Sequence, residues 1–130
     1  MERVGIVNGC FDVLHVGHIA MFEFAKKHCD FLYVLIDCDE MVRRSKGEDR
    51  PINCSKDRKK MLEALYLVDQ VMIFDSHDHL IELCKYLQAD VHIVGEEYKD
   101  KLVVGGDFAK TVMFFPRLAG YSTTEIVDGK

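Results

Sequence analysis

The chain has 130 residues and a mass of 15.0 kDa, which suits one domain with a single hydrophobic core. Hydrophobic residues make up 48% and charged residues 30%, as in an ordinary soluble globular protein. The net charge of -5 argues against a nucleic-acid-binding protein or one that binds an anionic membrane, because such proteins usually carry a basic face. It does not exclude small anionic ligands, which respond to local hydrogen-bond donors.

The five cysteines predict neither a disulfide framework nor a zinc site. They are Cys10, Cys29, Cys38, Cys54 and Cys84, an odd number without a CxxC pair. We expect reduced thiols in a cytoplasmic protein. The sequence has no signal-peptide pattern and no run of about twenty apolar residues, so no membrane partner is expected.

Five short stretches rich in β-branched and apolar residues predict buried strands. They occupy residues 3–8, 31–37, 70–75, 91–95 and 111–116. Strands that alternate with helices form right-handed βαβ units, and such units build a parallel sheet.

Helices are predicted between the strands, where apolar residues recur at helical spacing. They cover residues 16–28, 55–67 and 77–87, and Ser55 is a candidate N-cap for the second. The segment "MVRRSKGEDRPINCSKDR" is expected to be a polar, basic loop, and residues 98–110 a loop with a short helix. We predict an α/β fold with residues 1–130 as a single domain: a Rossmann-like, doubly wound, five-stranded parallel sheet in strand order 3-2-1-4-5.

Polar segments follow four of the predicted strands, at residues 8–18, 37–58, 95–101 and 117–124. In an open sheet of this kind a ligand binds beyond the carboxyl ends of the strands, near the point where strand order reverses. Because the strands are parallel, all four segments are expected at that same edge.

The stretch "NGCFDVLHVGH" joins the first strand to the first helix. Gly9 lets a ligand approach the backbone, and the helix start favours an anion. His15 and His18 share one helix face, and Gly17 leaves room between them for a phosphate or ribose. Two imidazoles there can stabilise charge on phosphoryl oxygens in a transition state. The alternatives are that the histidines cap the helix or are merely exposed, or that they bind zinc, for which no third ligand has suitable spacing.

Two longer motifs carry a family resemblance. "GCFDVLHVGH" resembles the GxFDxxHxGH signature of the cytidylyltransferase branch of the nucleotidyltransferase superfamily, and "RLAGYSTTEI" resembles its second signature, RxxGxSTTxI. "KDRKKMLEALYLVDQV" is similar to the family helix that leads into the third strand. Class I aminoacyl-tRNA synthetases share the HxGH element, but they are far larger and carry a lysine signature that is absent here.

The resemblance implies a role for each residue of these motifs. His15, His18 and Lys46 are expected to be catalytic, with Arg43, Arg44 and Arg50 as possible substitutes for the lysine. The residues expected to bind the nucleotide are Gly9, Cys10, Phe11, His15, Gly17, His18, Gly95, Glu96, Arg117, Gly120, Tyr121, Ser122, Thr123 and Thr124. Those expected to bind the acceptor are Lys46, Arg58 and Tyr98.

Several of these residues also have simpler interpretations. The basic loop can be a solvated turn, "STT" a helix cap, and Arg58 a helix-surface arginine. Asp12 can bond to backbone at the turn or assist a metal. His28, His77, His79 and His92 have no such context and are treated as incidental.

The resemblance implies a cytidylyltransferase that moves CMP from CTP to a small phosphorylated acceptor, with glycerol 3-phosphate as the first choice. The products would be a CDP-linked compound and pyrophosphate, with Mg²⁺ on the triphosphate, and the family favours a homodimer. "KGEDRPIN" instead resembles adenylyltransferases that form ADP-activated heptose from a sugar 1-phosphate. Phosphocholine, phosphoethanolamine or a phosphonate as acceptor also stay open. A noncatalytic nucleotide sensor is the alternative from another class.

Overall fold

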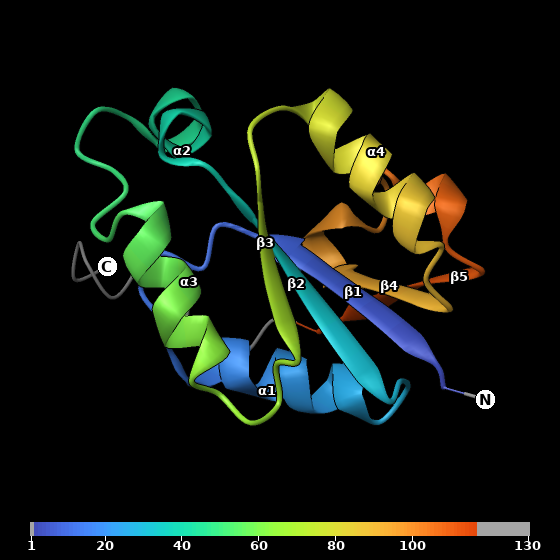
Figure 1. The fold of residues 1–130 in the computed structure, drawn as a ribbon. Helices are drawn as coiled ribbons and strands as arrows, with labels where there is room; N and C mark the ends of the chain where they lie inside the picture. The colour runs from blue at the N-terminus through green and yellow to red at the C-terminus, as the bar shows by residue number, and fades with distance from the viewer. Residues whose placement is uncertain (1, 117–130) are drawn as a thin grey trace.

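The computed structural model describes residues 2–116, which contain a five-stranded parallel sheet (Figure 1). The sheet order is β3-β2-β1-β4-β5, as the sequence predicted. The strands are β1 (Val4–Gly9), β2 (Phe31–Asp37), β3 (Gln70–Phe74), β4 (Val91–Gly95) and β5 (Thr111–Phe115). The order reverses at β1, so the carboxyl ends of β1 and β4 flank the expected ligand-binding crevice.

Helices cover both faces of the sheet (Figure 1). They are α1 (Val16–Lys26), α2 (Asp39–Lys46), α3 (Ser55–Glu63) and α4 (His77–Leu87), with two short 3-10 helices, η1 (Glu96–Tyr98) and η2 (Gly106–Phe108). In Figure 1, α1 and α3 lie on the side of the sheet opposite to α4, while α2 lies beyond the end of β2. This arrangement leaves the carboxyl edge of the sheet for ligands.

The hydrophobic core is split by the sheet into two clusters, as the alternation of side chains along a strand requires. Val7 and Val34 pack on one side with Phe22 of α1 and other buried residues. Ile6 and Leu35, the neighbours of those two valines in sequence, pack on the other side, where α4 contributes its apolar face. Because both faces are covered, the strands read as continuous apolar runs.

The expectation of a loop across residues 41–58 was wrong for its first part, which forms α2. This helix has Val42 as its one buried residue, so the sequence shows no apolar stripe. It is favoured instead by charge, with Asp39 and Glu40 in its first turn and basic residues in its last, which complement the helix dipole. Several boundaries also differ by a few residues. The N-cap of α3 is Cys54 rather than Ser55, α3 ends at Glu63 and α1 at Lys26, and β1, β3 and β5 are each displaced or shortened by one residue.

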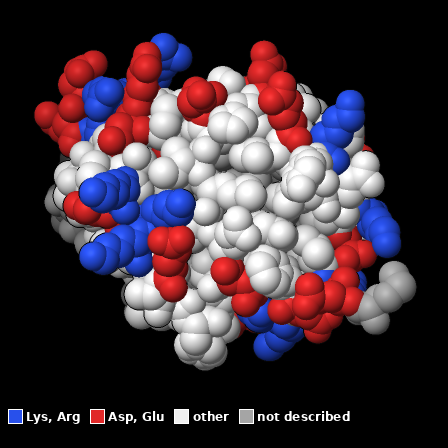
Figure 2. All heavy atoms as spheres, viewed as in Figure 1, with Lys and Arg blue, Asp and Glu red and all other residues white. Residues whose placement is uncertain are grey.

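Acidic and basic side chains are interspersed around the rim of the face in Figure 2, with uncharged surface between them. None of the helices in residues 2–116 is long and apolar enough to cross a membrane.

His92, which had no context in the sequence, lies fully buried in β4. Its Nε2 is 2.7 Å from Oδ1 of Asn8, in the adjacent strand β1. Burial lowers the pKa of His92 to about 4. The side chain is therefore neutral at neutral pH and belongs to the structural core of the sheet.

His92 is expected to make folding stability depend on pH. Its folded pKa lies below that of the unfolded chain, so its stabilising contribution is present above about pH 6.5 and is lost as the pH falls toward about 4. His92→Gln keeps a hydrogen-bond donor for Asn8 and removes the titration. Between pH 7 and pH 5 the variant should lose about 1 to 2 kcal/mol less unfolding free energy than the original chain. Urea unfolding at the two pH values measures this, and equal losses in both proteins would contradict it.

Candidate functional site

A cleft of about 960 Å³ lies at the carboxyl edge of the sheet. It is lined by nine of the residues that the sequence singled out: Gly9, Cys10, Phe11, His15, Gly17, His18, Lys46, Gly95 and Tyr98. Glu96 and Arg58 are not among its lining residues. The second signature, with Arg117, Gly120, Tyr121, Ser122, Thr123 and Thr124, lies outside the described residues.

The histidine pair is held at the start of α1. His15 is the N-cap residue, and its ring stacks on that of His18 with centroids 3.7 Å apart. The edge of Phe11 meets the other side of His18, with centroids 5.0 Å apart. Phe11 adopts a left-handed backbone conformation (φ 47°), and its ring lies 3.1 Å from where a Cβ at position 9 would stand. A side chain at position 9 would therefore crowd the Phe11 ring, which would have to shift by a few tenths of an ångström from its place beside His18.

His18 is a neutral hydrogen-bond donor rather than a cation. Burial lowers the pKa of His18 to about 3, and the neighbouring charges of His15 and Lys46 act in the same direction. The backbone N–H of His15 points at Nδ1 of His18, 3.4 Å away, so this nitrogen is the acceptor. The proton then belongs on Nε2, the other ring nitrogen. His18 can donate from there to a phosphate oxygen in the cleft.

Lys46 is the last residue of α2 and supplies positive charge to the same cleft. Gly47 follows it with φ 108°, a conformation that favours glycine and that ends the helix. The helix that the sequence did not predict is thus the element that places the predicted lysine.

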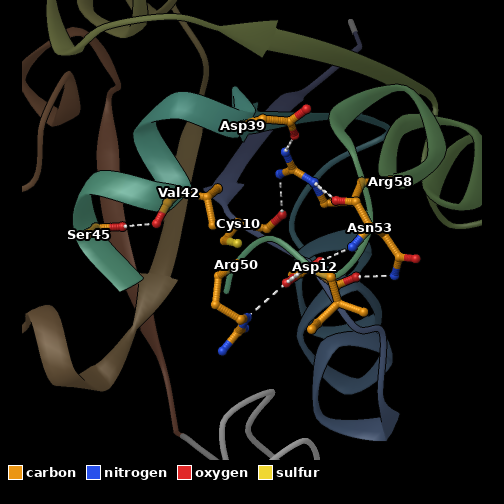
Figure 3. A network of polar contacts seen from close by, with 9 residues as sticks. Cys10, Asp12, Asp39, Val42, Ser45, Arg50, Asn53 and Arg58 are labelled. Atoms are coloured by element: carbon orange, nitrogen blue, oxygen red, sulfur yellow. Dashed lines mark hydrogen bonds and ion pairs between the residues drawn. The ribbon is translucent and has the colours of Figure 1, made fainter. Parts of the chain in front are cut away.

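Asp12 is the centre of a buried polar network that joins the first motif to the segment before α3 (Figure 3). Its carboxylate accepts hydrogen bonds from the backbone N–H groups of Ile52 and Asn53, at 2.7 and 2.8 Å, and from Nε of Arg50 at 3.0 Å. Burial alone would raise the pKa of Asp12, but these hydrogen bonds outweigh it and lower the pKa below its usual value. Asp12 therefore has the structural role that the sequence analysis gave as one of two alternatives.

Arg58 occupies a different place from the one expected of an acceptor-binding residue. It is 1% exposed, and each end of its guanidinium is occupied. Nε donates to the Asn53 carbonyl, Nη1 to the Cys10 carbonyl and Nη2 to the Asp39 carboxylate, all within 3.0 Å (Figure 3). Arg58 thus connects α2 and α3 to the residue that follows β1, and it is not among the residues that line the cleft.

The cleft also has polar residues to which the sequence assigned no individual role, of which His77 was treated as incidental and the others lie in the polar segments expected at this edge. Asp37 and Asn8 stand at the ends of β2 and β1, Glu97 follows β4, and His77 begins α4. Burial raises the pKa of Asp37, although Arg58 opposes the shift. The Glu97 carboxylate takes the space that a side chain at position 95 would fill, and Glu97, rather than the predicted Glu96, is among the residues that line the cleft. The signal in the sequence for these residues is their position at the end of a predicted strand or, for His77, at the start of a predicted helix.

The family model for cytidylyltransferase-like proteins matches residues 6–129. The chain belongs to the cytidylyltransferase-like family. This domain is therefore of the nucleotidyltransferase type, as the two motifs implied.

Relatives in this family include the bifunctional protein HldE of two bacteria. HldE of Campylobacter jejuni (serotype O:6) is 44% identical over 127 residues, which are 98% of this chain and 27% of HldE. HldE of a Nitratiruptor species has the same identity and coverage. The chain thus spans about a quarter of the length of these relatives.

Solved structures share the fold. A lipopolysaccharide core biosynthesis protein from Thermoplasma volcanium superposes with a TM-score of 0.73 at 22% identity, covering 88% of this chain and 98% of that one. Pantothenate synthetase from Thermus thermophilus superposes with a TM-score of 0.64 at 17% identity, covering 96% and 61%.

Removing Arg58 is expected to destabilise the domain strongly. Arg58→Leu leaves two backbone carbonyls and the partly exposed Asp39 carboxylate without their donor, and leaving a buried acceptor unsatisfied costs about 1–3 kcal/mol for each group. Lys60→Leu, which removes an exposed charge from the same helix, should stay within about 0.5 kcal/mol. Chemical unfolding of both variants measures the change in unfolding free energy. A loss for Arg58→Leu as small as that for Lys60→Leu would show that the hydrogen bonds of Arg58 do not stabilise the domain.

Proposed function

We propose that this domain transfers AMP from ATP to a sugar 1-phosphate, forming an ADP-sugar and pyrophosphate. The reaction class rests on one observation: the stacked pair of His15 and His18 lies in a cleft that Lys46 also lines. The choice of ATP and a sugar phosphate is supported by the resemblance of "KGEDRPIN" to adenylyltransferases that form ADP-activated heptose, and by the HldE relatives.

The resemblance first implied CTP as the nucleotide and glycerol 3-phosphate as the acceptor. The relatives do not support glycerol 3-phosphate as the acceptor. CTP stays as the second candidate nucleotide, because the matching family is described as cytidylyltransferase-like.

In the proposed reaction an oxygen of the acceptor phosphate attacks the α-phosphorus of the nucleotide. A new P–O bond forms there as the bond to the β-phosphate breaks, and pyrophosphate leaves. His18 donates from Nε2 to an α-phosphate oxygen, and Lys46 neutralises the charge that spreads over these oxygens. The cleft of about 960 Å³ is large enough to hold both substrates side by side.

Mg²⁺ is part of the proposal. At nucleotide sites it is usually held by substrate phosphates and one or two carboxylates. Asp37 and Glu97 are the carboxylates that line the described cleft, and they would complete its coordination. When bound, the ion neutralises charge on the triphosphate. Within residues 2–116, no three His, Cys, Asp or Glu side chains are grouped to hold a metal by themselves. A homodimer likewise stays a proposal from the resemblance.

Pyrophosphate release with matched substrate pairs tests the function. ATP or CTP is combined with heptose 1-phosphate, hexose 1-phosphate or glycerol 3-phosphate, and Mg²⁺ is supplied. We expect the fastest release from ATP with a sugar 1-phosphate. Faster turnover of CTP with any acceptor would reverse the choice of nucleotide. Tight nucleotide binding without turnover of any pair would favour the noncatalytic sensor.

His18→Ala is expected to lower turnover by about 10²–10³-fold, the usual loss on removing one positioned donor to a developing oxyanion. His28→Ala is the matched control, because His28 follows the other end of α1 and does not line the cleft. Circular dichroism and thermal unfolding establish that both variants are folded. Near-normal turnover in a folded His18→Ala protein would remove this residue from the chemistry.

A further inference from the structure

Arg50 is a nearly buried cation in the wall of the cleft. The residue is 9% exposed and is among those that line the cavity. Its Nε donates to Oδ2 of Asp12, a carboxylate that is itself fixed by two backbone N–H groups. The orientation of the guanidinium is therefore set by the fold before any ligand arrives.

One nitrogen of this guanidinium has no hydrogen-bond partner among residues 2–116. Nη2 of Arg50 is buried, yet it makes no hydrogen bond within the described part of the chain. Figure 3 shows the guanidinium at the edge of the network, with its far end directed away from Asp12. Buried polar atoms in folded proteins nearly always have a partner, so an orphaned donor in the wall of a binding cleft points to a ligand that accepts from it.

The charge balance of the cleft indicates what kind of ligand this is. Lys46 and Arg50 are the lysine and arginine among the described residues that line it, while Arg58 is engaged elsewhere. The histidines His15, His18 and His77 also line it, and His18 is neutral. A guanidinium suits phosphate because its planar fork can donate to two oxygens at once. Held away from water, it also acts more strongly than an exposed lysine.

We propose that Arg50 binds a phosphate group in this cleft, through the guanidinium edge that Asp12 leaves open. The proposal deepens the nucleotidyl-transfer function and rests on it for the identity of the phosphate. That phosphate belongs either to the nucleotide or to the acceptor, and the two sources share the same chemistry. Asp12 acts as a positioning residue, since it holds Arg50 and not the ligand.

Calorimetric titration of Arg50→Gln and Arg50→Lys tests the proposal. ATP and a sugar 1-phosphate are titrated separately into each protein. We expect one of the two affinities to fall at least about tenfold in Arg50→Gln, the loss typical of a hydrogen bond between charged groups. Arg50→Lys keeps the charge beside Asp12 and loses the fork, so it should restore only part of the affinity. Lys60→Gln is the control, because Lys60 is an exposed cation on α3 and does not line the cleft.

The two substrates distinguish the source of the phosphate. Weaker ATP binding assigns Arg50 to the nucleotide, and weaker sugar-phosphate binding with a raised acceptor KM assigns it to the acceptor. Affinities within twofold of the original chain for both ligands, in a folded variant, would overturn the proposal. If no substrate pair releases pyrophosphate but Arg50→Gln still weakens ATP binding, the proposed function fails and the phosphate contact stands.

A second measurement does not depend on a folded variant. In the unsubstituted chain labelled with ¹⁵N-arginine, the Nε–H resonance of Arg50 is assigned from its backbone and followed by NMR. Saturating ATP or sugar 1-phosphate should shift this resonance. An unchanged resonance with both ligands bound would also overturn the proposal.

Discussion

The candidate site depends on the buried carboxylate of Asp12. This carboxylate joins the turn after β1 to the segment around Ile52, about forty residues further along the chain. Arg58 makes a parallel connection from α3 to the Cys10 carbonyl and to the start of α2. Phe11 anchors the first of these loops in the core, but residues 47–54 of the second are mostly polar and have little apolar surface with which to pack. Charge-assisted hydrogen bonds in a buried setting give the definite geometry that catalysis requires.

The positive charge of the cleft lies on the segment that Asp12 and Arg58 hold, and not on His18. His18 is buried between two aromatic rings, and such burial disfavours its protonated form. A neutral donor does not repel Lys46 and can be placed close to the lysine without an electrostatic penalty. The positive charge then comes from the segment that Asp12 and Arg58 hold in place. The two sides of the cleft have complementary parts: α1 supplies His18 as a neutral donor, and the opposite segment supplies the cations Lys46 and Arg50.

The sequence was sufficient for the sheet and for the residues of the first motif, because both depend on strong local signals. β2 and β4 have the predicted boundaries, since their apolar runs end abruptly at polar residues. The α2 helix was missed because it buries almost nothing, and no periodicity reveals a helix that is stabilised by terminal charges. Arg58 was expected to bind the acceptor and His92 was treated as incidental. The structure buries both side chains against Asp39 and Asn8, which are distant in the chain, and a single sequence does not reveal contacts between distant residues.

The family signature therefore combines two kinds of residue whose roles only the structure separates. Within "GCFDVLHVGH", Gly9, His15, Gly17 and His18 line the cleft, while Asp12 faces away from it and holds another segment. Motif resemblance implies the reaction class but not the acceptor, since neither signature includes the polar residues at the cleft edges. Asp37, Glu97 and His77 are at those edges, and each follows or begins an element outside both signatures. The part of the cleft that the motifs leave unspecified is thus lined by strand ends and a helix start that the fold brings together.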